Sequence, residues 1–270
     1  MFAALCHASW SAIVKHSQNP LVVMAFTSII EIIVFLPMVF VVPLPSNEIW
    51  YFIIATTILH GLYRFNVIYS YKFGDLSFVY PIARGGSCLL IGLFSLIFLS
   101  NKLTALGFIG ILVICFGLFF ISYSKNIKFN KHAFFLAVTT ATLIATYTLV
   151  DGIGIRKSDY GFTYIVWMLL LNGIPVLCYA LISKKGFRAK NTYSLIEGFS
   201  AGILAILSYG LVVWSMQYIE IAYVSSIREF SIVIATLISF FILKEYHSNK
   251  RMLPAIIIVI GTTVVYFQVT

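Results

Sequence analysis

The sequence predicts an all-α integral membrane protein of ten transmembrane helices in two inverted five-helix repeats. Of its 270 residues, 61% are hydrophobic and 10% are charged, against roughly 45–50% and 25% in a soluble domain. Apolar runs of about 20 residues, long enough for a helix to cross the ~30 Å hydrocarbon core, recur along the whole chain. Barrel strands would be about ten residues long and would alternate in polarity. A similarity between the two halves predicts the repeat.

The first expected span is short. The N-terminal segment MFAALCHASWSAIVKHSQNP carries His7 and Trp10 within its apolar stretch. It lacks the basic start and the small-residue cleavage site of a signal peptide, so we expect a membrane helix over residues 2–16.

Nine further apolar runs follow. In the first half we expect spans at 20–42, 48–71, 76–99 and 103–124, the third of these following the loop-like residues Gly74 and Asp75. In the second half, the span at 132–153 carries a polar stripe that includes Thr140, Tyr147 and Asp151, and spans at 160–183, 194–216, 220–243 and 250–268 complete the set. Ten spans leave only short connections, so any function must lie within the helix bundle.

The second half resembles the first at a constant offset of 145 residues. The segment DLSFVYPIAR begins at Asp75 and the segment EIAYVSSIRE begins at Glu220. Each leads into an apolar span, a short polar turn and a further apolar span, so we divide the single membrane domain into repeats 1–126 and 127–270. Repeats of five spans, an odd number, must have opposite orientations in the membrane, which is typical of secondary transporters. The matched pairs are Asp75 with Glu220, Phe78 with Tyr223, Val79 with Val224, and Ile82 with Ile227.

Three motifs, together with the ten-span plan, resemble the EamA-type branch of the drug/metabolite transporter superfamily: LCHASWSAIVK, GDLSFVYPIARG and YTLVDGIGIR. More narrowly, they are similar to a bacterial subgroup of phosphonate-utilisation-associated membrane proteins. The resemblance implies a multi-pass metabolite carrier of the inner (plasma) membrane. Its central cavity would be lined mainly by spans 1, 3, 4, 6, 8 and 9. The resemblance names no substrate, because the superfamily moves amino acids, nucleotide sugars, vitamins and other small solutes.

Chargeable side chains inside the expected spans are the main functional candidates. Each arginine or acid at the centre of a membrane helix costs about 2.5–3.5 kcal/mol, so these groups must face the protein interior, one another or water. Three acids stand against three arginines, so the set can neutralise itself. The set is His7, Glu31, His60, Arg64, Arg84, Asp151, Arg228 and Glu229.

Arg84 falls opposite Glu229 in the repeat alignment. We therefore predict that these side chains pair across a pseudo-two-fold axis in at least one state. The pair would be either part of a gate or substrate cradle, or a fixed ion pair that holds the two halves together. Pro81 removes a backbone hydrogen bond one turn earlier, which predicts a locally opened helix. Gly85 and Gly86 serve either that opening or close helix packing.

Other candidates also have two interpretations. Arg64 shares a helix face with His60 and either holds a carboxylate or phosphonate in bidentate fashion, or pairs with Glu31 or backbone carbonyls. Asp151 binds an amine, carries a coupling proton, or caps the end of its helix; Glu229 is the second candidate for the coupling proton. The expected substrate-binding set is His7, Trp10, Tyr63, Arg64, Tyr80, Arg84, Tyr147, Asp151, Arg228 and Glu229.

These residues predict a secondary transporter of a small polar or zwitterionic metabolite, amino-acid-like or aminophosphonate-like, that works by alternating access. A lipid or lysolipid flippase is the alternative. The sequence contains no nucleotide motif, metalloprotease motif or serine-hydrolase motif, so we expect neither an enzyme nor a cofactor or metal. The net charge of +9 comes mainly from Lys and Arg in connections and at helix ends, which suits lipid head groups better than nucleic acid. The expected partners are a small-molecule substrate and membrane lipids, and the expected state is a monomer or homodimer.

Two lines of reasoning disagree on orientation. Twelve Lys and Arg residues lie in odd-numbered connections and three in even-numbered ones, so the positive-inside rule places both termini outside the cytoplasm. The family resemblance implies the opposite.

Overall fold

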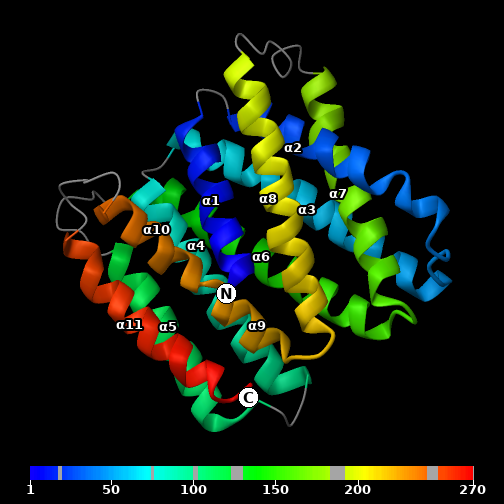
Figure 1. The fold of residues 1–270 in the computed structure, drawn as a ribbon. Coiled ribbons are helices and arrows are strands. Elements are labelled where there is room, and N and C mark those ends of the chain that lie inside the picture. The colour runs from blue at the N-terminus through cyan, green and yellow to red at the C-terminus, as the bar shows by residue number, and fades with distance from the viewer. Residues whose placement is uncertain are drawn as a thin grey trace. The chain divides into compact units, whose positions relative to one another are not determined.

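The computed structural model describes residues 1–17, 20–73, 76–99, 103–122, 130–182, 192–241 and 249–269. Every regular element in these ranges is helical, and most begin and end close to the predicted apolar runs (Figure 1). The helices are α1 (Phe2–His16), α2 (Pro20–Phe35), η1 (Met38–Phe40), α3 (Asn47–Phe73), α4 (Leu76–Phe94), η2 (Ser95–Leu99), α5 (Ala105–Ser122), α6 (Lys131–Lys157), α7 (Gly161–Ile182), α8 (Thr192–Met216), α9 (Ile221–Arg228), α10 (Phe230–Phe241) and α11 (Asn249–Tyr266).

Five helical segments are long and apolar enough to cross a membrane, by length and composition: Leu21–Phe40, Ile82–Leu99, Lys131–Lys157, Gly161–Ile182 and Leu195–Met216. Three shorter apolar helices accompany them: Phe2–Val14, Ala105–Ile121 and Met252–Tyr266. This is the pattern of a multi-pass α-helical membrane protein.

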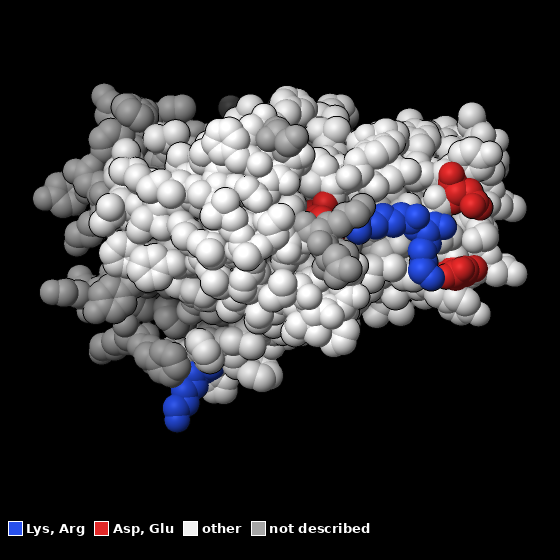
Figure 2. Space-filling model, turned by 90° about the horizontal axis from the view of Figure 1, so that it is seen from below, with Lys and Arg blue, Asp and Glu red and all other residues white. Residues whose placement is uncertain are grey.

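The outer surface agrees with that class. Figure 2 shows a face on which uncharged side chains dominate and the few visible Lys, Arg, Asp and Glu residues stand in small groups. Large apolar side chains such as Ile33, Ile97 and Phe116 are exposed. Exposed apolar area on this scale is suited to contact with lipid rather than water.

The chain folds into two compact units. Unit 1 comprises Met1, Tyr69–Leu149 and Ile219–Thr270, and unit 2 comprises Phe2–Ile68 and Val150–Tyr218. Each unit therefore draws on both halves of the sequence. Unit 1 contains α4, α5, α9, α10 and α11, whereas unit 2 contains α1, α2, α7 and α8.

In unit 1, α5 packs directly on α11, and both helices lie side by side in Figure 1. A Cβ atom on Gly117 would lie 2.7 Å from Ile258 Cγ1, and one on Gly261 would lie 2.7 Å from Ile114 Cγ1. A Cβ on Gly110 would lie 2.9 Å from Cγ2 of Val265. Residues with higher numbers in α5 thus contact residues with lower numbers in α11, so the two helices run antiparallel. Glycine allows this close backbone approach.

In unit 2, α2 packs on both α7 and α8, and α1 packs on α8. A Cβ on Gly173 would lie 3.0 Å from the backbone oxygen of Ser28, and one on Gly202 would lie 2.8 Å from Ile30 Cβ. Small residues thus set the spacing of helices here as well.

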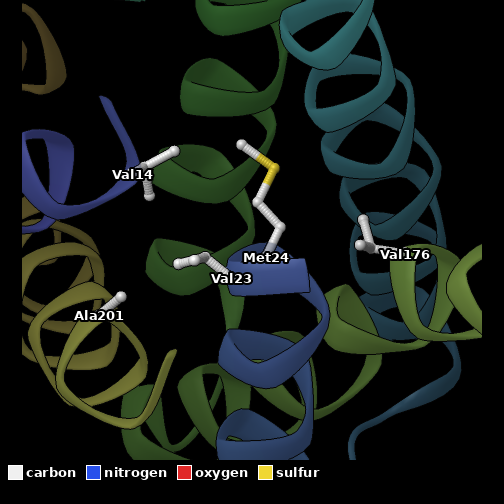
Figure 3. Packing of buried hydrophobic residues seen from close by; sticks show 5 residues of the cluster. All are labelled: Val14, Val23, Met24, Val176 and Ala201. Carbon is white, nitrogen blue, oxygen red and sulfur yellow. The ribbon is translucent and has the colours of Figure 1, made fainter. Parts of the chain in front are cut away.

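Apolar side chains from four helices close the core of unit 2. Figure 3 shows five of these side chains around the start of α2. Trp10, Ile13 and Val67 pack against the same cluster. Each larger side chain buried in this way contributes about 1.5–3 kcal/mol. The cluster is Val14, Val23, Met24, Val176 and Ala201.

The predicted opening at Pro81 is wrong. Helix α4 runs unbroken through Pro81 to Phe94. The proline removes one backbone hydrogen bond, and the helical bonds on either side of it keep the helix continuous. Gly85 and Gly86 serve packing instead: a Cβ on Gly85 would lie 3.2 Å from Leu118 Cβ, and one on Gly86 would lie 3.0 Å from Ala141 Cβ.

The interruption lies in the ninth predicted span, 220–243, which forms two helices that meet at Glu229. The N–H of Glu229 donates to the carbonyl of Ser226 at 3.0 Å, and the N–H of Ile232 donates to the carbonyl of Glu229 at 3.0 Å. These are i→i−3 bonds, which tighten the helix locally. The Ser226 hydroxyl donates to the Tyr223 carbonyl at 2.9 Å, and serines that bond back to the helix backbone bend it.

Candidate functional site

The predicted pairing of Arg84 with Glu229 is confirmed within unit 1. Arg84 Nε, on α4, donates to Glu229 Oε2 at 2.9 Å. Arg84 is 3% exposed and Glu229 is 0% exposed. A charge-assisted bond of this kind is stronger than a neutral one, and its carboxylate lies at the junction of α9 and α10.

Arg228 adds a second guanidinium at the same junction. It is 4% exposed, and its Nε and Nη2 atoms have no hydrogen-bond partner among the described residues. Glu229 Oε1 and the hydroxyls of Ser225 and Ser231 also lack partners within the described part of the chain. Buried polar atoms without partners are costly. We call Arg84, Arg228 and Glu229 the unit 1 charge centre; it carries two positive charges and one negative charge.

Two predicted tyrosines belong to unit 1. Tyr147 is buried in α6. Tyr80 lies in α4, but its side chain is outside the described residues. Of the predicted residues in unit 1, the structure joins Arg84 and Glu229 directly, and Arg228 precedes Glu229 in the chain.

In unit 2, Arg64 pairs with Glu31. Arg64 Nη2 donates to Glu31 Oε1 at 2.7 Å, and Nη1 donates to Glu31 Oε2 at 3.2 Å and to the Ser28 hydroxyl at 3.2 Å. Of the two interpretations of Arg64, pairing with Glu31 is thus the one seen. A Cβ on Gly173 would lie 3.1 Å from Glu31 Oε2, so the glycine leaves room for the carboxylate beside α7.

Asp151 is the centre of a second polar cluster in unit 2. It is 0% exposed. The Tyr164 hydroxyl donates to its Oδ1 at 2.9 Å, the Tyr209 hydroxyl donates to its Oδ2, and His60 Nε2 lies 3.4 Å from Oδ2. The His60 and Tyr209 rings meet edge to face with centroids 5.0 Å apart. We call Asp151, His60, Tyr164 and Tyr209 the Asp151 cluster.

The helix-capping interpretation of Asp151 is wrong. Helix α6 continues past Asp151 to Lys157. Gly154, one turn further on, is a packing residue: a Cβ there would lie 2.7 Å from the Tyr164 ring. The glycine lets that ring approach α6 closely enough for its hydroxyl to reach Asp151.

Sequence reasoning missed Tyr164 and Tyr209. Both tyrosines lie in apolar runs among many other aromatic residues, and only tertiary packing brings them to Asp151. A weak signal was present for Tyr164, because Gly154 follows Asp151 by three residues and so shares its helix face.

The remaining predicted residues lie in unit 2. His7 and Trp10 are on one face of α1 with ring centroids 5.6 Å apart, and Trp10 packs against the core cluster. Tyr63 is half-buried on α3. The predicted set therefore divides into His7, Trp10, Tyr63, Arg64 and Asp151 in unit 2 and Tyr80, Arg84, Tyr147, Arg228 and Glu229 in unit 1.

Comparisons with known proteins identify the family. Residues 131–267, just over half of the chain, match the EamA-like transporter family. One solved crystal structure is similar with a TM-score of 0.77 and 14% sequence identity, over 99% of this chain and 95% of the other. At that identity the likeness shows the fold alone. No curated protein gives a significant sequence match. The chain belongs to the EamA-like transporter family, within the drug/metabolite transporter superfamily, and is a multi-pass membrane transporter.

Proposed function

We propose that this protein is a secondary transporter of a small zwitterionic metabolite, amino-acid-like or aminophosphonate-like, in the inner membrane. It would work by alternating access with ten spans in two inverted repeats. The observation that carries the proposal is the unit 1 charge centre, where the buried Arg84–Glu229 pair lies at a helix junction next to the buried Arg228. Interrupted helices near the membrane midplane are common at transporter substrate sites.

The unpartnered atoms of the centre favour a zwitterion. Arg228 offers Nε and Nη2, the edge of a guanidinium that binds a carboxylate or phosphonate in bidentate fashion. Glu229 offers Oε1, which accepts a hydrogen bond from an ammonium group, while its Oε2 is held by Arg84. An anionic group at Arg228 would also neutralise the excess positive charge of the centre.

Packing within each unit supports the inverted repeat. At the offset of 145 residues, Arg84 meets Glu229 in unit 1, and Ser28 meets Gly173 in unit 2. A residue that contacts its own repeat equivalent is expected where a pseudo-two-fold axis passes, as in an isologous interface.

The packing of α5 on α11 has the same reciprocity. Gly117 approaches Ile258, and Gly261 approaches Ile114. Gly117 and Gly261 are 144 positions apart in the chain, as are Ile114 and Ile258, so each contact is the repeat equivalent of the other. Because these equivalent helices run antiparallel, the operation that relates them reverses direction across a membrane. That is the relation expected of inverted repeats.

A thermal-shift screen tests the proposed function. The purified full-length chain would be heated with L-alanine, L-serine, 2-aminoethylphosphonate, putrescine, uridine and lysophosphatidylcholine. A solute at a hundredfold excess over Kd stabilises the folded state by about 2.7 kcal/mol. We expect a zwitterion to raise the melting temperature of the wild type and not that of Arg228→Gln. The control Lys157→Gln makes the same charge change at an exposed residue and should keep the response.

The screen also separates the alternatives. Stabilisation by lysophosphatidylcholine alone would favour a flippase. A zwitterion response that is unchanged in Arg228→Gln would place the binding site away from the unit 1 charge centre.

A further inference from the structure

The two acids buried among the described helices of unit 2 have different charge partners. Glu31 is compensated by Arg64, a permanent cation, through two hydrogen bonds. Among the described residues, one basic side chain lies within 4 Å of Asp151, that of His60, and its other two partners are tyrosine hydroxyls. A histidine is a cation only when protonated, so within the described residues the charge of Asp151 is balanced when the Asp151 cluster holds an added proton.

Burial makes this balance energetically important. Asp151 is 0% exposed and His60 is 6% exposed. An acid at the centre of a membrane helix costs about 2.5–3.5 kcal/mol unless it is paired. With a carboxylate and a neutral imidazole the pair has one negative charge. After uptake of one proton it is neutral, whether the proton resides on Asp151 or on His60.

The hydrogen bonds bring the two groups to one point. The Tyr164 and Tyr209 hydroxyls both donate to Asp151. His60 Nε2 lies 3.4 Å from Asp151 Oδ2, so one added proton can lie on the imidazole or on the carboxylate.

We propose that His60 and Asp151 form a proton-binding site that takes up one proton from water and holds it between the imidazole and the carboxylate. One atom of the pair, a ring nitrogen or a carboxylate oxygen, gains the proton and no other covalent bond changes. In the proposed transporter this is the proton available for coupling to solute movement; that role, but not the site, rests on the proposed function. Of the two predicted coupling candidates, Asp151 and Glu229, the charge balance favours Asp151, because Arg84 already neutralises Glu229.

An ion pair and two tyrosines surround the site. Arg64 on α3 and Glu31 on α2 act on His60 electrostatically, and they form an ion pair with each other. The Tyr164 hydroxyl on α7 and the Tyr209 hydroxyl on α8 both donate to Asp151.

Infrared difference spectroscopy tests the site. The full chain would be prepared in lipid nanodiscs with ¹³C-carboxyl aspartate or ¹⁵N-histidine, and spectra compared between about pH 4 and pH 9, a range that spans the ordinary values of both groups. The chain has three aspartates and five histidines. We expect one titration step in which both labels report a buried histidine–aspartate pair that gains one proton per chain.

Matched variants assign that step. It should be lost in Asp151→Asn and in His60→Gln, and should persist in Asp159→Asn and His132→Gln, whose wild-type side chains are exposed. If Asp151→Asn fails to fold, His60→Gln decides alone, because it keeps the carboxylate and both tyrosine partners. Difference spectra that are identical in the wild type and His60→Gln would overturn the proposal.

The measurement needs no solute, so it is independent of the proposed function. A titration step in a protein that binds no zwitterion would support the proton site and contradict the proposed zwitterion transport. Zwitterion binding without the step would support the transporter and contradict the proton site.

Discussion

At the scale of single residues, the Arg84–Glu229 pair should be sensitive to the loss of one partner. Arg84→Met leaves Glu229 buried without its guanidinium partner, which costs about 3–5 kcal/mol, whereas replacing both members by apolar residues is often close to neutral. We expect the double variant Arg84→Met/Glu229→Leu to recover most of the melting temperature that Arg84→Met loses. A double variant as unstable as the single one would show that other contacts of these residues hold unit 1 together.

Arg228 should behave in the opposite way. Its Nε and Nη2 atoms have no partner among the described residues, so Arg228→Met removes a buried charge without leaving another one unpaired. We expect the melting temperature of Arg228→Met to equal or exceed that of the wild type while stabilisation by a zwitterion is lost. A large loss of stability would mean that the guanidinium has a structural role.

Residues of these two centres differ in how far the sequence predicted them. The offset of 145 residues placed Arg84 opposite Glu229, because a repeat carries information about contacts between distant segments. No repeat relation connected Asp151 with Tyr164 or Tyr209. These contacts depend on how α6, α7 and α8 pack, and the spacing of residues in the sequence does not predict the packing of separate helices.

At the scale of helices, the glycines of α5 and α11 should tolerate no side chain. Gly117→Ala and Gly261→Ala each place a Cβ 2.7 Å from an isoleucine and within 3.1 Å of a backbone oxygen. Overpacking of this kind costs about 1–3 kcal/mol, and thermal melting of the purified variants would measure it.

Gly210 provides the control in α8. A Cβ there would lie 3.6 Å from Leu169 Cδ1, an ordinary contact, so Gly210→Ala should be neutral or stabilising by about 0.5–1 kcal/mol. Equal losses at Gly210 and Gly117 would argue that helix packing does not depend on the α5–α11 glycines.

Most helix boundaries agreed with the hydropathy pattern. The helix interruption, which was predicted at Pro81, lies instead at Glu229. Helix α4 continues through Pro81, whereas the Ser225–Ser226 pair, which precedes Arg228 and Glu229, accompanies the break at Glu229. Serine gives no distinctive signal in a sequence, because its effect depends on whether its hydroxyl bonds to the backbone, as that of Ser226 does here.

At the scale of the whole molecule, the sequence predicted an all-helical membrane protein, because long apolar runs indicate helices that are surrounded by lipid. It did not predict that each compact unit would combine segments of both halves. Which segments form a compact unit depends on which helix faces pack together. The similarity of the two halves is a relation between sequences and does not predict that packing.

Membrane orientation is a whole-molecule prediction from the distribution of loop charges. With both termini outside, the connection after α6 faces the exterior and the connection before it faces the cytoplasm. We expect Ser158→Cys, but not Asn130→Cys, to react with a membrane-impermeant maleimide in intact cells, in a background where the exposed Cys178 is replaced by serine. The reverse pattern would support the orientation implied by the family.

The central claim is that the unit 1 charge centre binds a zwitterion during transport. Counterflow in proteoliposomes tests it most directly: vesicles loaded with unlabelled 2-aminoethylphosphonate or L-alanine are diluted into the radiolabelled form of the same solute. We predict transient accumulation of label with the wild type and with Lys157→Gln, and none with Arg228→Gln. Counterflow that persists in Arg228→Gln, or the absence of counterflow with either solute in well-folded wild-type protein, would contradict the account.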